Sequence, residues 1–253
     1  MPTRSATSVS SRLSVTRSRI ALIAALLVCC ASTAHAAGAT GLLNDTGQTQ
    51  CDNGSNVMAA CTIGNTGDAA TYKRQDGRFG RDPAAPAKVG GGVAGFDFSK
   101  VCFNGDLQGA GTCTGSLVAN TTAAATGAPT TDWACTKDNV TNLIWSLQSG
   151  NGDWTTYAST TLPTATNAAS RCGFATGWRL PTRRELLGIV LNDGSNPSVD
   201  ASYFPSTQSN WYWTSDTYAP SPSGAWVVVF DSGYTFAGVK TSSNYVRLVR
   251  SGQ

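Results

Sequence analysis

Side chains that could act as nucleophiles, acids, bases or metal ligands are few in this sequence of 253 residues. The chain has one histidine, His35, and one glutamate, Glu185. Ser-His-Asp and Cys-His nucleophiles and histidine-ligated zinc all need a histidine, and His35 lies in the N-terminal segment that we expect to be cleaved. Glycoside hydrolysis usually needs two carboxyl groups. No motif supplies an aspartate partner for Glu185. We therefore expect no enzyme and no cofactor, with chemistry carried by aspartates alone as an open alternative.

The first 36 residues have the pattern of a secretory signal peptide. Arginines without any acidic residue precede an apolar run from Ile20 to Cys30, and the small-residue sequence Ala34-His35-Ala36 follows. The run of about 11 residues is shorter than the roughly 20 residues that cross a bilayer. We expect cleavage after Ala36 and export to the periplasm, the cell surface or the medium. Acylation of Cys29 or Cys30 is a weaker alternative, because neither follows Gly or Ala.

Cleavage changes the inventory of the mature chain. It removes His35 and four of the 18 basic residues but none of the 15 acidic ones, which leaves 14 basic against 15 acidic residues and a formal net charge of −1. No cluster of Lys and Arg could follow a phosphate backbone, so nucleic acid is not an expected partner. We also expect no transmembrane span after cleavage, because no second apolar stretch is long enough.

The six cysteines that remain after cleavage are an even number in a compartment that oxidises thiols, which favours three disulfides. They are Cys51, Cys61, Cys102, Cys113, Cys135 and Cys172. None of them shows the Cys-x-x-Cys spacing of a zinc site. Six cysteines allow 15 connectivities, and spacing alone leaves them open. Pairing of nearest neighbours is the expected set: Cys51 with Cys61, Cys102 with Cys113, and Cys135 with Cys172.

Composition divides the mature chain. All seven tryptophans lie between Trp133 and Trp226, whereas the preceding residues are rich in Gly, Ala and Thr and offer little large apolar material for a core. Disulfides would compensate for that thin core. We expect a signal peptide at 1–36, a cysteine-containing N-terminal region at 37–116, a linker or surface loop at 117–131 and a C-terminal domain at 132–253.

Two short helices are expected in the C-terminal domain. Thr182 and Glu185 match a capping box, an apolar face follows, and the turn at 192–194 should end the helix. That face consists of Leu186, Leu187, Val190 and Leu191. A second helix should cover 165–171 and end at Gly173, beside Cys172.

Strands are expected at 143–147, 212–214, 225–230, 234–239 and 245–249, where aromatic and β-branched residues gather. Between two of them, Asp231-Ser232-Gly233 has the length and the glycine of a three-residue hairpin loop. Two short helices with a small antiparallel sheet make the expected fold class α+β.

Several phrases of this domain, roughly Asp132 to Arg250, recur in the same order in a family of secreted bacterial domains. The phrases run from Asp138 to Trp145, from Gly177 to Leu186, from Tyr203 to Pro205, from Tyr212 to Ser215, from Ala225 to Phe230 and from Val246 to Arg250. On these residues the chain resembles the Lcl C-terminal domain family. The family pattern usually has glycine where this chain has Asn142, and asparagine is the next most tolerant residue of a left-handed turn.

The resemblance implies a C-type-lectin-like fold, related to that of formylglycine-generating and sulfatase-modifying domains. The oxidase activity of those enzymes uses a cysteine pair near the C-terminus, and this chain has no cysteine after Cys172. Relatives often carry a cysteine in the closing phrase, at the position of Leu248. Some relatives bind sulfated polysaccharides, which makes glycans an expected ligand class.

The phrase from Gly177 to Leu186, which we call the central phrase, carries residues that we expect to have mainly a structural role. Glu185 should close the helix N-terminus, and Arg179 should anchor a neighbouring strand or carboxylate. The other residues of this structural motif are Trp178, Pro181 and Thr182.

Aromatic residues are the candidate ligand contacts, because their rings can stack on sugars or on a partner surface. If Tyr212 points inward, its strand neighbours Trp211 and Trp213 point outward together. The competing interpretation, which we favour for Trp213, places it in the core with Trp145, Trp178 and Trp226. The candidate set is Trp211, Trp213, Tyr218, Tyr203, Arg183 and Arg184; with Lys240, the two arginines could complement an acidic polysaccharide or form an ordinary solvated face.

An oxygen-rich segment, Asp193, Asn196 and Asp200, could bind calcium or serve turns alone, and we expect the latter. The sugar-binding tripeptides of calcium-dependent lectins do not occur in the sequence. The sequence thus predicts a secreted or cell-envelope binding and adhesion module for a polysaccharide or a surface protein. The alternative is a structural component of an envelope or appendage assembly.

Overall fold

The computed structural model describes residues 44–52, 58–60, 87–122 and 128–252, all within a compact unit that spans Ala37–Gln253. The signal peptide expected at 1–36 and Cys61 lie outside the described residues. In the described part of the chain, no helix combines the length and the hydrophobicity needed to cross a membrane.

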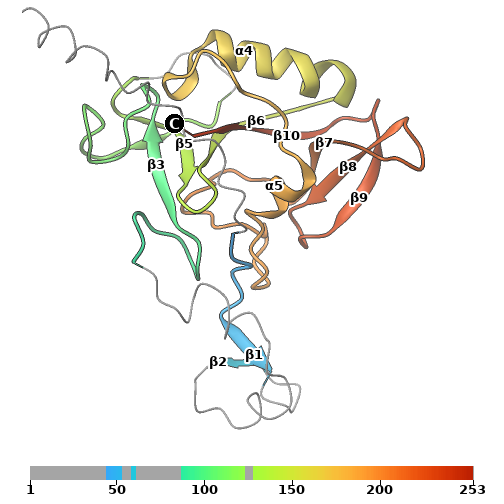
Figure 1. Cartoon of the computed structure of the whole chain (residues 1–253), viewed down its shortest axis with the longest axis horizontal. Helices are drawn as coiled ribbons and strands as arrows, with labels where there is room; N and C mark the ends of the chain where they lie inside the picture. The colour runs from blue at the N-terminus through green and yellow to red at the C-terminus, as the bar shows by residue number, and fades with distance from the viewer. Residues whose placement is uncertain (1–43, 53–57, 61–86, 123–127, 253) are drawn as a thin grey trace, which may run out of the picture. The chain divides into compact units, whose positions relative to one another are not determined.

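A mixed eight-stranded sheet dominates the structure (Figure 1). Its strands are β3 (Phe98–Cys102), β4 (Val118–Ala119), β5 (Asp132–Asp138), β6 (Leu143–Gly152), β7 (Trp211–Thr217), β8 (Gly224–Val229), β9 (Thr235–Val239) and β10 (Asn244–Ser251). The spatial order is β3-β5-β6-β10-β7-β8-β9, and β4 pairs beside β5. Pairing is antiparallel except for β10 with β7 and β4 with β5. A separate two-stranded antiparallel sheet joins β1 (Gln50–Asp52) and β2 (Met58–Ala60).

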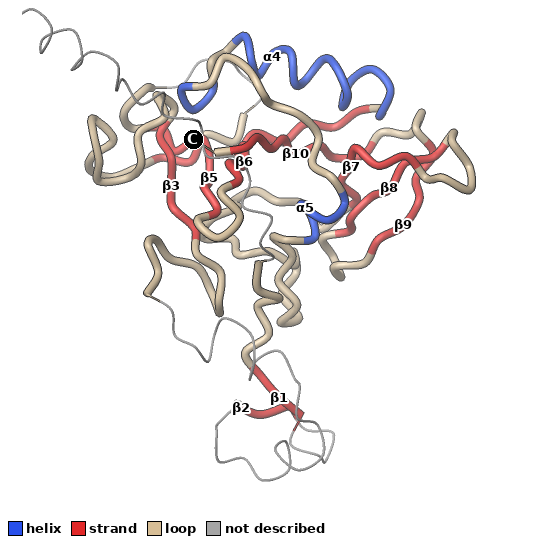
Figure 2. The backbone as a smooth tube through the Cα atoms, in the orientation of Figure 1, coloured by secondary structure: helices blue, strands red, loops and turns tan. Residues whose placement is uncertain are grey.

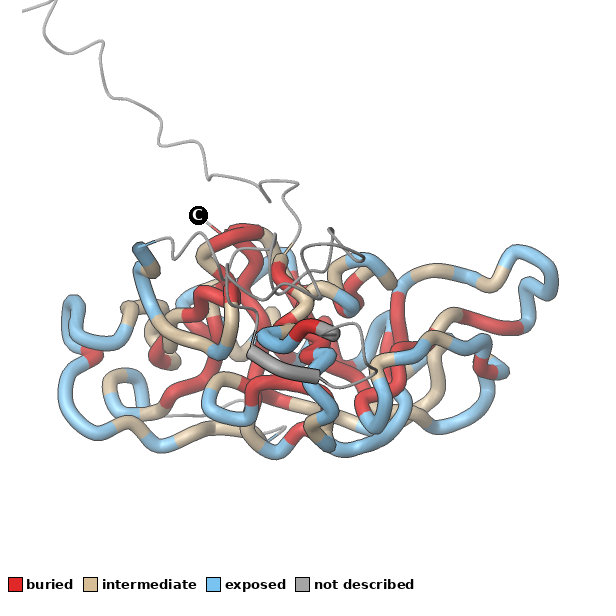
Figure 3. The backbone as a smooth tube through the Cα atoms, turned by 90° about the horizontal axis from the view of Figure 1, so that it is seen from below, coloured by how far each residue is buried: buried red, intermediate tan, exposed pale blue. Residues whose placement is uncertain are grey.

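Helices cover both faces of the large sheet (Figure 2). On one face, a π-helix, η1 (Trp154–Thr161), continues into α4 (Leu162–Ala168), and their Ala158 and Leu162 pack in one core cluster with Trp213, Val227 and Val246. On the other face, α5 (Arg183–Leu187) packs Leu186 in a second cluster with Tyr212, Val228 and Val249. Figure 3 shows buried segments in the interior and exposed segments in the surrounding loops. A sheet covered on both faces can bury consecutive residues of one strand.

The helix expected at Thr182 begins as predicted but is shorter. Thr182 caps α5, and the reciprocal hydrogen bonds of a capping box are present. The helix ends at Leu187 instead of continuing to Leu191. Ile189, Val190 and Leu191 are all buried. Three consecutive residues span about 200° around an α-helix and cannot all face one core, so the backbone leaves the helix after Gly188.

The second helix begins earlier than expected. The Asp153 side chain accepts hydrogen bonds from Thr156 N and Tyr157 N and caps η1, which precedes α4 without a break. Cys172 lies in a short 3-10 helix, η2 (Arg171–Gly173), with a φ of 55°. The threonines of η1 lower helix propensity, and this concealed the helix in the sequence. Burial of Ala158, Leu162 and Thr166 against the sheet outweighs that preference.

The predicted strands are all present, as β6 to β10, and the hairpin between β8 and β9 has Gly233 at a φ of 76°. Asn142 adopts a φ of 56°, which confirms the left-handed turn. Strands β1 to β5 were not predicted, and β3 to β5 make the large sheet wider than expected. The expectation of a purely antiparallel sheet is wrong, because β10 pairs with β7 and β4 with β5 in parallel, while the α+β class holds. Val118–Ala119, inside the expected linker at 117–131, pairs with β5. The sheet therefore contains strands from both sides of the expected boundary.

Two of the expected disulfides are present. Cys102 is bonded to Cys113 and Cys135 to Cys172, with sequence separations of 11 and 37 residues. The second bond ties β5 to η2. The expected partner of Cys51, Cys61, lies outside the described residues.

Candidate functional site

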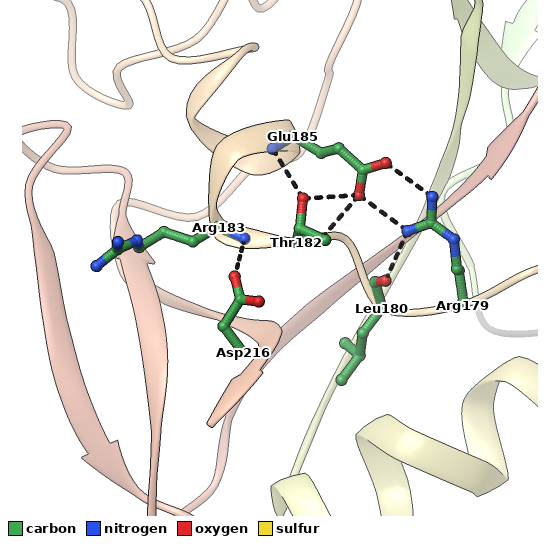
Figure 4. A network of polar contacts seen from close by, with 6 residues as sticks. All are labelled: Arg179, Leu180, Thr182, Arg183, Glu185 and Asp216. Carbon is green, nitrogen blue, oxygen red and sulfur yellow. Dashed lines mark hydrogen bonds and ion pairs between the residues drawn. The ribbon is translucent and has the colours of Figure 1, made fainter. Parts of the chain in front are cut away.

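The Arg179–Glu185 pair forms the polar network of the central phrase (Figure 4). Arg179 Nη1 donates to Glu185 Oε2 at 2.8 Å, and Nη2 donates to Oε1 at 2.7 Å. The same Oε2 accepts from the Thr182 backbone N–H at 2.7 Å. Main-chain hydrogen bonds between Arg179 and Val249 join this segment to β10. The network therefore caps α5 and attaches it to the sheet, as the structural interpretation predicted.

Both charges of this pair are favoured by their contacts. Burial would raise the pKa of Glu185, but the hydrogen bonds from Arg179 and Thr182 together lower it below its usual value. The hydrogen bond to Glu185 raises the pKa of Arg179 against the opposing effect of burial. The pair stays ionised at neutral pH and its net charge is zero.

Arg183 and Tyr218 meet on the face of the sheet that α5 covers. The Arg183 guanidinium lies 4.2 Å from the centre of the Trp226 ring, and Tyr218 contacts the same ring edge to face at 5.1 Å. The backbone N–H of Arg183 donates to Asp216 Oδ2 at 2.6 Å (Figure 4). Arg184 is exposed in the last turn of α5. Trp226, expected in the core, is only half-buried and forms the base of this cluster.

Trp211 lies elsewhere, at the start of β7. Its ring stacks on Phe236 with centroids 6.0 Å apart and 14° between the planes. Trp211 is 39 % exposed and Phe236 49 %. Tyr234, two residues before Phe236, is 67 % exposed and should share its side of the strand. We call Trp211, Tyr234 and Phe236 the aromatic platform.

Two candidate residues do not join the platform. Trp213 is fully buried, so the proposal that it contacts a ligand beside Trp211 is wrong and the core interpretation is confirmed. Its indole Nε1 donates to Gly152 O at 3.0 Å beneath the η1–α4 cover. Tyr203 is half-buried against Phe98, with ring centroids 5.6 Å apart. The candidate contacts are thus divided among separate parts of the surface.

An open cleft of about 440 Å³ lies where η1, α4, β7 and the segment before α5 meet. We call it the tryptophan cleft, and its lining includes Trp154, Trp178, Arg179, Leu180, Thr182 and Ser215. Trp154 donates through Nε1 to Thr214 O at 2.7 Å. The indole Nε1 of Trp178 is buried and has no hydrogen-bond partner among the described residues.

In the oxygen-rich segment expected to form turns, Asp193 and Asp200 both accept from the residue two positions later, and Asp200 also makes a long-range contact. Asp193 accepts from Ser195 N at 2.8 Å, and Asp200 accepts from Ser202 N at 2.9 Å and from Val93 N at 3.0 Å. In the residues that the structure describes, no group of three His, Cys, Asp or Glu side chains is placed to hold a metal ion.

Sequence reasoning missed Trp154, Tyr234 and Phe236. A signal existed for the last two, because the three-residue loop at 231–233 sets the register of the β8–β9 hairpin. This register places Phe236 opposite Val227 of β8, and Val227 pairs on its other side with Trp213 of β7. Trp211 lies two residues before Trp213 and therefore comes close to Phe236. No comparable signal placed Trp154, because the helix that carries it was not predicted.

Comparison with known proteins places the second half of the chain in a family. Residues 134–250 match the model of the Lcl C-terminal domain, and this part of the chain belongs to that family. A search of curated proteins found no match.

Proposed function

We propose that this Lcl C-terminal domain is an exported binding and adhesion module of C-type-lectin-like fold, which recognises a polysaccharide and catalyses no reaction. The observation that carries the proposal is the aromatic platform, in which Trp211 and Phe236 stack while keeping about two fifths and half of their surfaces exposed. Exposed aromatic side chains that cluster are typical of binding surfaces. Single exposed apolar residues, by contrast, are common on any protein surface.

The platform is suited to an extended ligand. Trp211 comes from β7 and Phe236 from β9, on either side of the central β8, so the rings are supported by three hydrogen-bonded strands. Rings held in place by a rigid sheet lose little conformational entropy on binding. Their apolar faces match the C–H faces of sugar rings, and the adjacent Tyr234 adds a hydroxyl.

Export of the module is supported by two kinds of observation. The N-terminal 36 residues have the composition of a signal peptide. The bonds Cys102–Cys113 and Cys135–Cys172 are of the kind that forms and persists in oxidising compartments. The site of action proposed is the periplasm, the cell surface or the medium.

Glycan-array and affinity measurements with Trp211→Ala test the proposal. We expect the substitution to weaken polysaccharide binding at least tenfold, equivalent to about 1.4 kcal/mol, because it removes one ring of the platform. Leu187→Ala is the matched control, since Leu187 is 37 % exposed on α5, on the opposite face of the sheet. Absence of binding to any glycan, or equal affinity of the Trp211→Ala variant, would refute the proposed function.

A structural role in an envelope assembly is the second candidate, and the edge strand β9 favours it. Among the described strands, β9 pairs only with β8, and Phe236 and Val239 are 49 % and 58 % exposed on it. Unprotected edge strands accept a strand from another chain. In that case another envelope protein should co-purify without sugar, and Val239→Lys should abolish the association.

A further inference from the structure

The tryptophan cleft is a preformed cavity separate from the aromatic platform. Trp154 and Ser159 come from η1, Pro163 from α4, and Ser215 from β7. Its walls are joined by main-chain contacts, since Ser215 N donates to Pro181 O at 2.7 Å and Trp154 N donates to Lys240 O at 2.9 Å. The volume of about 440 Å³ lies within the range of small-ligand sites.

The charged group that lines the cleft is already neutralised. Both terminal nitrogens of Arg179 are bonded to Glu185 at 2.8 and 2.7 Å, so the guanidinium offers no net positive charge to a ligand. The nearby ammonium of Lys240 lies 4.0 Å over the Trp154 ring, donates to Thr217 Oγ1 and is not part of the lining. A negatively charged ligand would therefore gain little electrostatic attraction in the cleft, and a neutral ligand is at no disadvantage there.

The remaining polar groups of the lining are neutral hydrogen-bonding groups. Trp178 is 3 % exposed, and its indole N–H has no partner among the described residues. Other atoms cover this N–H, so it is not open to a ligand in the cleft. The exposed Ser215 hydroxyl likewise makes no hydrogen bond within the described part of the chain. The rings of Trp154 and Trp178, with Pro163 and Leu180, supply apolar surface beside these groups.

We propose that the tryptophan cleft binds a single uncharged pyranose residue of a glycan. Such a ring presents its C–H faces to the half-buried Trp154 indole and its hydroxyls to the exposed Ser215 hydroxyl. This proposal rests on the proposed glycan-binding function and adds a second, separate contact with its own ligand class. A polysaccharide could then be held at the platform while one of its residues enters the cleft.

Binding of simple sugars to the full exported chain tests the cleft directly. The probes are the methyl glycosides of glucose, galactose and mannose, and N-acetylglucosamine, followed by saturation-transfer NMR and calorimetry. We expect saturable binding of at least one probe with a dissociation constant on the order of 1 mM. Glucuronate should bind no more tightly than the methyl glucoside, because none of the described lining residues offers a free positive charge.

Substitutions that fill the tryptophan cleft test whether the sugar binds there. Ser215→Trp on β7 and Ser159→Trp on η1 should each weaken sugar binding at least tenfold, because both residues line the cleft. Ser242→Trp is the matched control, since Ser242 is an exposed serine in the turn between β9 and β10. It should leave binding unchanged, as should Trp211→Ala. Circular dichroism of each variant checks that it is folded.

Failure of this proposal is distinguishable from failure of the proposed function. No saturable binding of any probe, tighter binding of glucuronate, or unchanged binding in both filled variants would overturn the cleft assignment. If polysaccharide binding still depended on Trp211, the platform function would stand alone. Sugar binding that is lost in both filled variants, without any polysaccharide binding, would support the cleft and refute the platform.

Discussion

The arginines of the family phrases have different structural roles, although the sequence alone does not distinguish these roles. Arg247 is buried, and its guanidinium donates to Ser146 O at 3.1 Å and to Thr207 Oγ1 at 2.9 Å. Arg250, three residues later, lies 3.4 Å over the Phe174 ring. Arg171, which lies outside these phrases, is also buried, and this burial lowers its pKa to about 10. These arginines fill and order the interior, whereas Arg179 is paired near the surface.

Glu185→Gln should change how stability depends on pH. Glu185 has a lowered pKa in the folded protein, so its carboxylate adds stability above the unfolded-state pKa, near 4.3. That contribution is lost as the pH falls through the lower, folded-state pKa. At pH 7 we expect the substitution to cost about 1–2 kcal/mol, with a small share from the ion pair because the Arg179 side chain is 43 % exposed.

Urea denaturation from pH 7 to pH 2 measures this effect. The difference between the wild type and the Glu185→Gln variant should narrow below about pH 4.3. Asp231→Asn is the control, because Asp231 is an exposed carboxylate in the β8–β9 turn. A difference that stays constant across the whole pH range would contradict the assigned role of the ionised Glu185.

Single elements are shaped by what covers them. The β8–β9 hairpin forms as the sequence predicts, but its two faces differ: Gly238 is buried beneath Trp213, while the neighbouring Ala237 is exposed. A Cβ at Gly238 would lie 3.0 Å from Trp213 Cη2. The glycine therefore allows β9 to approach the buried tryptophan of β7.

Gly238→Val should destabilise the protein, whereas Ala237→Val should not. The valine methyl groups at 238 would press on the Trp213 ring, and overpacking of this kind costs about 1–3 kcal/mol. At 237 the added methyl groups face solvent on a strand, where valine is favourable. Thermal and urea unfolding of the two variants measures the difference. Equal stability of both variants would mean that Trp213 can move aside without cost.

At the scale of the whole molecule, the large sheet connects segments that are far apart in the chain. The edge strand β3 pairs with β5, and Phe96 and Phe98 belong to the same core cluster as Trp145 and Tyr212. Residues on the N-terminal side of the expected boundary at 131 thus contribute to the core of the domain. The two disulfides described above each have one cysteine in the paired strands β3 and β5, since Cys102 ends β3 and Cys135 is part of β5.

Removal of the Cys135–Cys172 bond should cost more than removal of the Cys102–Cys113 bond. In the chain-entropy model, loops of this size give about 4 and about 3 kcal/mol, because the longer loop restricts the unfolded chain more. The variants are Cys135→Ser with Cys172→Ser, and Cys102→Ser with Cys113→Ser. Chemical denaturation under oxidising conditions compares them. The opposite order of stabilities would show that folded-state packing outweighs loop entropy here.

Local sequence signals determined much of the fold. The capping box at Thr182, the alternating strands from β6 to β10, the glycine of the β8–β9 loop and the left-handed turn at Asn142 all depend on neighbouring residues, and each is present. The family followed from six ordered phrases, and residues 134–250 match its model. The structural roles of Arg179 and Glu185 could also be predicted, because they lie only six residues apart.

Tertiary structure alone decided which aromatic residues meet solvent and which segments form the cavity. Trp211 and Trp213 lie two residues apart on β7 and share one face of the strand, yet Trp211 is 39 % exposed and Trp213 is fully buried. The η1–α4 segment packs on the face of the sheet that carries Trp213, and its threonines concealed it from sequence reasoning. The tryptophan cleft needs the same segment beside β7 and residues 178–182. Contacts between residues so far apart depend on the packed layers, which no local pattern encodes.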